Sequence, residues 1–235
     1  MARRISQEAT NKRVKQMVDK REHLIKTGEV ENVHVKLQKG NRKTGVNCWT
    51  VSLIPIADCG KNCEKCSKDC YDIRNDCWMT VVQNDRARNS AIHKTDIARY
   101  WNEINIQIKA NFVTQLRLNV GGDLTLQDFY YIKKIAEENP KTMILFFTKA
   151  YEDLNVFLDN NEFPSNVKKI MSVWKDTPIE NKHNVPVSHV LWEDGSTTAP
   201  EYGAVFCGGN CSECAFNGDG CWNLKDGESV VFRVH

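Results

Sequence analysis

Eight of the ten cysteines in this 235-residue chain lie in two short segments. The first segment, CGKNCEKCSKDCY, has the spacing C-x3-C-x2-C-x3-C, and the second, CGGNCSECAFNGDGCW, has the spacing C-x3-C-x2-C-x6-C. Cysteine thiolates are soft ligands that suit zinc and iron–sulfur clusters. The spacing therefore predicts two metal sites, whose ligands would be Cys59, Cys63, Cys66 and Cys70 in the first segment and Cys207, Cys211, Cys214 and Cys221 in the second.

The compactness of each segment favours iron over zinc. Structural zinc sites usually combine two separated C-x2-4-C pairs. Here each set of four cysteines lies in one continuous loop, which suits a cubane whose irons offer ligand positions at different corners. We therefore expect one or two [4Fe-4S] clusters, with zinc as the alternative at the glycine-rich C-terminal site. The other two cysteines, Cys48 and Cys77, are expected to be buried or spare thiols.

The composition is that of an ordinary globular protein, with 41% hydrophobic residues, 26% charged residues and a net charge of +2. This charge gives little support to nucleic-acid binding, although the first thirty residues carry eight basic side chains against four acidic ones. No apolar run suits a signal peptide or a membrane span. We expect a cytoplasmic protein without a membrane partner, whose cysteines stay reduced rather than forming disulfides.

A helix and a β-hairpin are expected at the N-terminus. An apolar stripe predicts a helix over residues 5–28, and we treat residues 1–30 as a basic N-terminal helical segment. The clean alternation of residues 33–37 and the strand pattern of residues 47–56 flank a turn-rich segment. Together these patterns predict a hairpin whose second strand leads into the first cysteine loop.

We interpret residues 31–235 as a single βα metal-binding domain with cysteine loops at 59–70 and 207–221. Alternation of strands and helices predicts right-handed βαβ units and a parallel sheet. Six parallel strands are too few for a closed eight-stranded barrel, so the expected α/β fold is a partial (βα)6 barrel, with an open doubly wound sheet as the alternative. In a curled sheet the two cysteine loops would share one rim. The expected elements are strands near 47, 115, 142, 168, 185 and 204, an edge strand at 230–234, helices at 126–139 and 151–160, and helical character over 80–113.

Polar side chains follow several of these strands. In α/β folds ligands bind at the carboxyl ends of the strands. Asp123, Lys149 and Asp176 are therefore the candidate catalytic residues, although residues at these positions often only cap a loop. His189 lies within a strand pattern and is expected to be either a satisfied buried histidine or a ligand.

The first cysteine loop resembles that of the radical S-adenosylmethionine (SAM) enzymes, in which three cysteines hold a [4Fe-4S] cluster and one iron binds SAM. The turn after the next strand resembles the glycine-rich turn of that superfamily. This resemblance implies a radical-SAM-like partial barrel in which Gly121, Gly122 and Asp123 contact the cofactor. Two departures stand out: Cys70 is available as a fourth ligand, and Lys65 replaces the usual aromatic residue before the third cysteine.

Five segments in order resemble the phage and prophage gene product 88 family: SLIPIADC to CY (52–71), RLNVGGD (117–123), FFTKAY (146–151), IMSVWKD (170–176) and the C-terminal cysteine set ending in Cys-Trp (207–222). The resemblance covers about residues 46–222. It implies a mobile-element protein in a bacterial host and a metal-bound βα fold, and it supplies no known reaction.

These patterns lead to three functional hypotheses. The first is an iron–sulfur redox enzyme that uses SAM or another small-molecule or redox partner. The second is a non-catalytic electron-transfer or sensor protein whose clusters are fully ligated. The third is a zinc-stabilised module that binds nucleic acid or protein.

Overall fold

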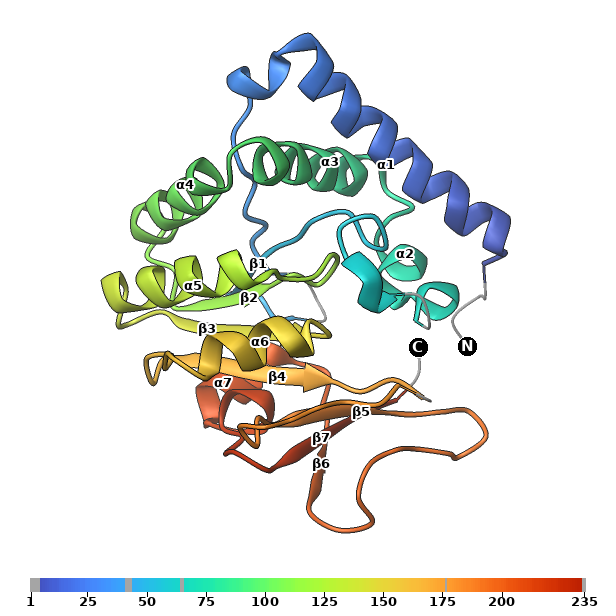
Figure 1. The fold of residues 1–235 in the computed structure, drawn as a ribbon, viewed down its shortest axis with the longest axis vertical. Helices are drawn as coiled ribbons and strands as arrows, with labels where there is room; N and C mark the ends of the chain where they lie inside the picture. Colours follow the sequence, from blue (N-terminus) through green and yellow to red (C-terminus); the bar gives the residue numbers. More distant parts are fainter. Residues whose placement is uncertain (1–4, 41–43, 64–65, 176, 234–235) are drawn as a thin grey trace.

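The computed structural model describes residues 5–40, 44–63, 66–175 and 177–233, and within them one parallel sheet of seven strands (Figure 1). The strand order is β1-β2-β3-β4-β5-β7-β6, and every pair of neighbouring strands is parallel. The parallel α/β fold expected from the sequence is therefore confirmed. The strands are β1 (Cys48–Val51), β2 (Gln115–Leu118), β3 (Met143–Thr148), β4 (Val167–Ser172), β5 (Val187–Leu191), β6 (Ala204–Phe206) and β7 (Ser229–Arg233).

The helices begin and end at residues that suit their positions. The Ser6 side chain accepts a hydrogen bond from the Ala9 N–H at the start of α1, and Gly28 ends α1 in a left-handed conformation. Asp96 separates α3 from α4 and caps α4 through the Arg99 N–H. The helices are α1 (Gln7–Thr27), α2 (Tyr71–Asn75), α3 (Thr80–Thr95), α4 (Ile97–Ala110), α5 (Leu126–Glu138), α6 (Tyr151–Leu158) and α7 (Cys211–Asn217), with 3-10 turns η1 (Glu29–Asn32), η2 (Gly60–Cys63), η3 (Ser67–Asp69) and η4 (Gly220–Trp222).

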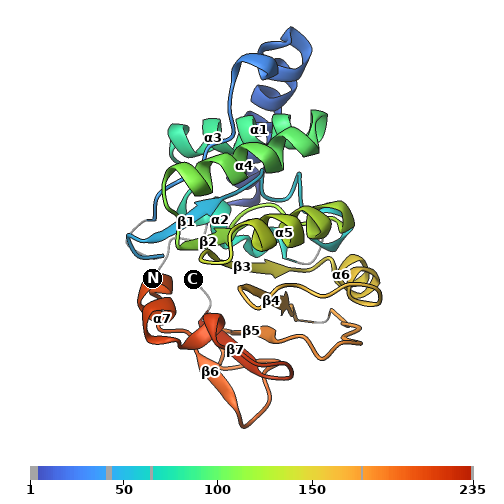
Figure 2. The same cartoon turned by 90° about the vertical axis from the view of Figure 1, so that its left-hand side faces the viewer.

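Alternate residues of the strands face two different helical layers. Leu116, Leu118 and Phe146 belong to the main core, which includes Phe129 of α5 and Phe157 of α6. Residues of the opposite parity, such as Leu145, pack in a second cluster with residues of α7 and η4. Figure 2 shows α7 on the opposite side of the sheet from α5 and α6. The central strands are therefore buried on both faces, which explains why they are apolar throughout.

Two of the expected β elements differ in the structure. The terminal strand lies between β5 and β6 rather than at an edge, because the segment from β6 through α7 to β7 returns the chain to the middle of the sheet. The edge strands are β1 and β6. Among the described residues, the two edge strands are not hydrogen-bonded to each other, so the sheet is not closed. The partial barrel therefore stays a prediction.

The expected N-terminal hairpin is reduced to one antiparallel bridge between Gln38 and Thr50. Side chains of α3 and α4 bind the main chain of residues 33–37 in place of a strand. The Glu103 carboxylate accepts from the Val35 N–H at 2.6 Å, and the Asn89 amide bonds to both the N–H and the C=O of Lys36. These side chains satisfy main-chain groups that a β-ladder would otherwise have to satisfy.

Helix α1 packs on α3 above the rest of the fold (Figure 1). Met17 is fully buried in a cluster with Ile54, Cys77 and Val82. Arg21 is also buried, and its guanidinium binds Asp58 in the first cysteine loop. The N-terminal helix thus contacts the segment that carries the first cysteine set. No helix within the described ranges is both long and apolar enough to cross a membrane.

A buried polar network joins α3 to α5 and leads to a pH prediction. Asp128 accepts hydrogen bonds from His93 and Trp101, both at 2.8 Å. Burial lowers the pKa of His93, but the hydrogen bond to Asp128 and the charge of that carboxylate together raise it above its ordinary value. Burial raises the pKa of Asp128, but the hydrogen bond and charge of His93, with the bonds from Thr125 and Trp101, together lower it. The ion pair therefore stabilises the fold most between pH values of about 3.9 and about 6.5, the ordinary pKa values of aspartate and histidine.

We expect the His93→Gln variant to lose about 1–3 kcal/mol of unfolding free energy near pH 5 and less above pH 8. The raised pKa of His93 stabilises the fold below the unfolded pKa of about 6.5, and this contribution disappears as the pH rises through the folded value. The lowered pKa of Asp128 stabilises the fold above the unfolded value of about 3.9, and this contribution disappears as the pH falls through the folded value. Urea unfolding of both proteins at pH 5 and pH 8.5 measures the difference, and an equal deficit at the two values would contradict it.

Candidate metal centres

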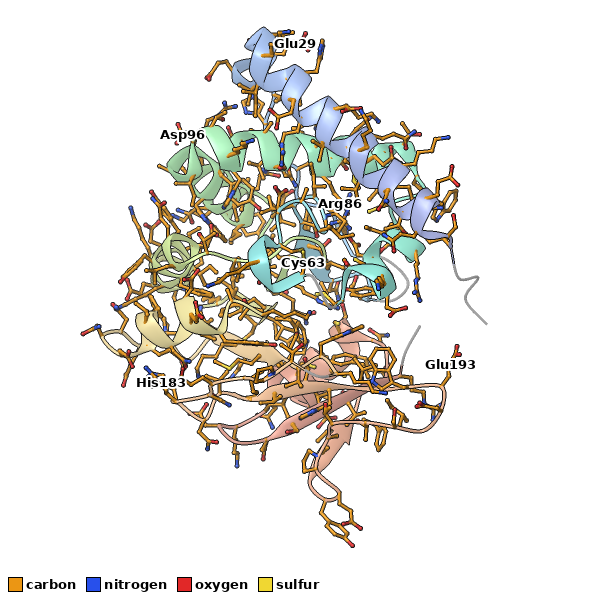
Figure 3. The ribbon with its side chains drawn as sticks, turned by 45° about the vertical axis from the view of Figure 1, so that its right-hand side comes forward. Glu29, Cys63, Arg86, Asp96, His183 and Glu193 are labelled. Atoms are coloured by element: carbon orange, nitrogen blue, oxygen red, sulfur yellow. The ribbon has the colours of Figure 1, made fainter. Side chains whose placement is uncertain are left out.

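The first cysteine set lies at the carboxyl end of β1, as the sequence predicts. The chain passes from β1 through η2 and η3 to α2, and Cys59, Cys63, Cys66 and Cys70 are all partly buried. Figure 3 shows Cys63 in this loop, below α1 and α3. All ten cysteines of the chain are thiols. Burial raises the pKa of Cys70 to about 12, so binding a metal there would displace a proton.

Ile56 arranges the main chain around two of these sulfurs. Its N–H donates to the Cys59 sulfur at 3.2 Å, and its C=O accepts from the Cys63 thiol at 3.6 Å. Its φ angle is 68°, a left-handed conformation that is rare for a β-branched residue. Such strained backbone concentrates at functional sites, where the surrounding structure enforces it. The loop therefore holds a main-chain donor against a sulfur at the cost of local strain.

Asp58 connects this loop to three other parts of the fold. Its carboxylate accepts from the Ile54 N–H at 2.8 Å and from the Arg21 guanidinium of α1 at 2.9 Å. Its C=O accepts from the Asp123 N–H at 2.9 Å. The first cysteine loop is thus tied to α1 and to the turn that follows β2.

The Gly121–Gly122 turn packs closely against the chain itself. A Cβ atom on Gly121 would lie 2.2 Å from the Asp72 carboxylate, and one on Gly122 would lie 2.6 Å from Cβ of Leu53. The Gly121 C=O accepts from the Leu53 N–H at 2.9 Å. Close packing therefore explains why both positions are glycine, since a side chain at either one would clash. The role of Gly121, Gly122 and Asp123 as cofactor contacts stays a prediction.

Asp123 joins the carboxyl ends of β2 and β3. Its buried carboxylate accepts from the Thr148 hydroxyl at 2.6 Å, the Lys149 N–H at 2.9 Å and the Leu124 N–H at 2.8 Å. Burial raises the pKa of Asp123, although these bonds and the Lys149 charge oppose the rise. The Lys149 ammonium lies 5.9 Å from the ring centre of Trp174. Two of the three candidate catalytic residues are therefore neighbours, and Asp176 lies outside the described residues.

His189 is a partnered histidine of β5. Its Nδ1 lies 2.9 Å from the Thr198 hydroxyl. Burial lowers the pKa of His189 below its ordinary value, so the ring is neutral at pH 7. The sequence left open whether His189 is a buried histidine with a hydrogen-bond partner or a metal ligand. The bond to Thr198 favours the first hypothesis.

The second cysteine set begins with Cys207 at the carboxyl end of β6 and continues over a face of the sheet towards the amino end of β1. Helix α7 carries Cys211 and Cys214, and it approaches the segment before β1. The Ser212 N–H donates to the Thr44 C=O at 2.8 Å, and a Cβ atom on Gly45 would lie 2.4 Å from Cβ of Ser212. Helix α7 folds back from β6 across the sheet, so a rim shared by the two cysteine loops, which was expected for a curled sheet, stays a prediction.

Cys48 and Arg117 lie among the C-terminal cysteines. Cys48 is fully buried and lies beside Cys211. The Arg117 guanidinium lies 3.6 Å from the Cys211 sulfur and 3.5 Å from the Tyr71 hydroxyl. The neighbouring Cys48 thiol is the main cause that lowers the pKa of Cys211; burial opposes this shift and Arg117 adds to it. Arg117 reaches from Cys211 to Tyr71, the residue that follows Cys70.

The family model for gene product 88 matches residues 16–221. The chain belongs to the gene product 88 family. The match extends beyond the region of motif resemblance at its N-terminal end and covers most of α1 together with both cysteine sets. Comparisons with curated proteins and with solved structures found no match.

Sequence reasoning missed a buried ion pair in this gene product 88 chain. Arg86 of α3 binds Asp72 of α2 at 2.6 Å, and both side chains are at most 5% exposed. Arg86 also donates to the Leu53 C=O at 3.3 Å. Asp72 comes two residues after Cys70, so the pair lies directly behind the first cysteine loop. The only signal in the sequence was a pair of opposite charges in predicted helical or loop segments, which is too common to single out.

The donor chemistry of both sites fits metal–thiolate centres. No three His, Cys, Asp or Glu side chains within the described ranges already surround one common point as ligands of a single ion would. The first loop nevertheless offers four thiols and a main-chain N–H directed at sulfur. The second set offers thiols beside a guanidinium whose buried Nε has no hydrogen-bond partner among the described residues. A half-buried cation without a carboxylate partner suits an anionic thiolate centre.

Proposed function

We propose that this gene product 88 protein is an iron–sulfur protein in which Cys59, Cys63, Cys66 and Cys70 hold one [4Fe-4S] cluster. The observation that carries the proposal is the Ile56 N–H, which donates to the Cys59 sulfur in a loop with four thiols. N–H···S bonds of this kind tune the reduction potentials of such clusters. A bound cluster would take up and release single electrons.

Electron transfer or sensing is the role that the surroundings support best. The C=O of Gly121 and the N–H of Asp123 bind Leu53 and Asp58, and the Asp123 carboxylate binds three groups of its own chain. The main-chain groups are thus already used in holding the loop, and the carboxylate in joining the ends of β2 and β3. Four cysteine ligands would close the cluster, and the expected partner is another redox protein or a small redox molecule in a reducing cytoplasm.

A radical-SAM-like enzyme is the second candidate. It is favoured by the position of the Gly121–Asp123 turn, which is hydrogen-bonded to the first cysteine loop at Leu53 and at Asp58. In that case Cys70 would not be a ligand, one iron would be open to SAM, and Asp123 and Lys149 would lie beside it. This candidate also includes the proposal that the sheet curls into a partial barrel.

The first test is the metal content of the full-length protein purified without oxygen. We expect about four iron and four sulfide per chain for one cluster, with broad absorption near about 400 nm that bleaches on reduction. Iron near eight per chain would indicate that the C-terminal set also holds a cluster, and zinc beside iron would indicate a mixed protein. Protein that contains zinc but neither iron nor sulfide would overturn the proposal and favour the zinc-stabilised binding module.

A further inference from the structure

Arg117 lies on the face of the sheet that α7 covers, at the point where the two cysteine sets approach each other. Its neighbours Leu116 and Leu118 face the main core, so alternation along β2 directs Arg117 to the other side. The guanidinium carbon lies 5.1 Å from the ring centre of Phe147. Its hydrogen-bond partners are the Cys211 sulfur and the Tyr71 hydroxyl, neither of which is a carboxylate.

Two buried N–H donors next to these cysteines lack hydrogen-bond partners within the described residues. They are Nε of Arg117 and Nε1 of Trp222, the residue that follows Cys221. An unsatisfied buried donor costs about 1–3 kcal/mol, so two in one place indicate that an acceptor belongs there. Thiolates are acceptors and carry the charge that balances Arg117.

The sulfurs that share this apolar environment are not the four that the sequence grouped. Cys48, Cys211, Cys214 and Cys221 pack in one cluster with Leu145, Ile170 and Trp222. Cys48 is the fully buried member of this set of four and begins β1, on the face that also carries Arg117. Cys207 is exposed: its charge acts on Cys214 and Cys221, so it lies near them, but it does not pack in the apolar cluster. Its N–H binds the Val231 C=O at the end of β6.

We propose that the C-terminal site is a metal–thiolate centre held by Cys48, Cys211, Cys214 and Cys221, with the half-buried Arg117 as its counter-cation. Cys48 takes the ligand position expected for Cys207. Four thiolates around one zinc ion, or around one [4Fe-4S] cluster, leave a net negative charge that Arg117 balances. Arg117 is a positioning residue: it orients the Cys211 sulfur and reaches Tyr71, which follows a cysteine of the first loop. This assignment does not depend on what the first loop binds.

The test compares bound zinc and iron per chain in full-length protein carrying Cys59→Ala, which removes any metal of the first loop. Adding Cys48→Ala should abolish the remaining metal, whereas adding Cys207→Ala should leave it. Cys77→Ala is the matched control, since it removes another fully buried thiol away from this site. Cys48→Ser serves if the alanine variant does not fold, as judged by circular dichroism. If the first-loop proposal fails, Cys59→Ala contains as much metal as the unmodified chain and the comparison still holds.

Three outcomes would overturn the assignment: no metal in the Cys59→Ala protein, loss of metal in the Cys207→Ala variant, or retention of metal without the Cys48 thiol. For Arg117, competition with a chelator measures Zn²⁺ affinity of the metal-free protein. Arg117→Gln should weaken it by about 10–100-fold, as removal of outer-shell partners does, and Arg117→Lys should restore part of it. Equal affinity of Arg117→Gln and the unmodified chain would exclude the counter-cation role.

Discussion

The Cys59→Ala variant is expected to lose nearly all the iron bound by the first loop. Cys59 supplies the sulfur that already accepts the Ile56 N–H, so its removal deletes both a ligand and the one main-chain bond to sulfur at that position. Iron and sulfide analysis together with the absorption spectrum measures the loss. Cys77→Ala is the control, because Cys77 is buried against Met17 and Val82 rather than in the loop.

Cys70→Ala separates the two redox proposals. If four cysteines close the cluster, this variant should lose most of its iron, as Cys59→Ala does. If the protein is a SAM enzyme, the Cys70→Ala cluster should survive, and adding SAM to the reduced protein should change its EPR spectrum. Iron content that stays at the unmodified level in both variants would contradict any cluster in this loop.

The second large effect is expected from the ion pair behind the loop. Arg86→Met leaves the Asp72 carboxylate buried without its cation, and breaking a buried pair in this way costs about 3–5 kcal/mol. Burial already raises the pKa of Asp72 even with Arg86 present. Without Arg86 that pKa rises further, so the folded variant binds a proton that the unfolded chain releases above about pH 4. The stability deficit should therefore be larger at pH 7 than near pH 4.

Denaturant unfolding of the metal-free proteins measures this deficit. The double variant Asp72→Asn with Arg86→Met should recover much of the stability, because neither partner of this pair is then charged. Lys109→Met is a suitable comparison, since it breaks the partly exposed Lys109–Glu138 pair, and such pairs contribute about 0–1 kcal/mol. A deficit for Arg86→Met no larger than that for Lys109→Met would show that the Asp72–Arg86 pair does not stabilise the loop.

The main secondary-structure elements could be predicted because their signals are local. The helix expected over 126–139 is α5, Leu126–Glu138, and the strand expected at 142–147 is β3, Met143–Thr148. In the first, apolar residues recur at helical spacing up to Pro140, and in the second an uninterrupted apolar run is buried on both faces. The expected hairpin failed because its first strand has strand periodicity but finds its hydrogen-bond partners in Glu103, Asn89 and Gln107, more than fifty residues along the chain.

The sequence by itself determined the α/β class, the position of the first cysteine loop after β1 and the membership of the gene product 88 family, because periodicity, spacing and motif order are properties of neighbouring residues. Only the tertiary structure decided which side chains meet. It brought Cys48 beside Cys211 and placed Arg117 between the two cysteine sets. It also inserted β7 within the sheet. These contacts depend on how α7 folds back over the sheet, and the packing energy that decides this is shared among residues far apart in the chain.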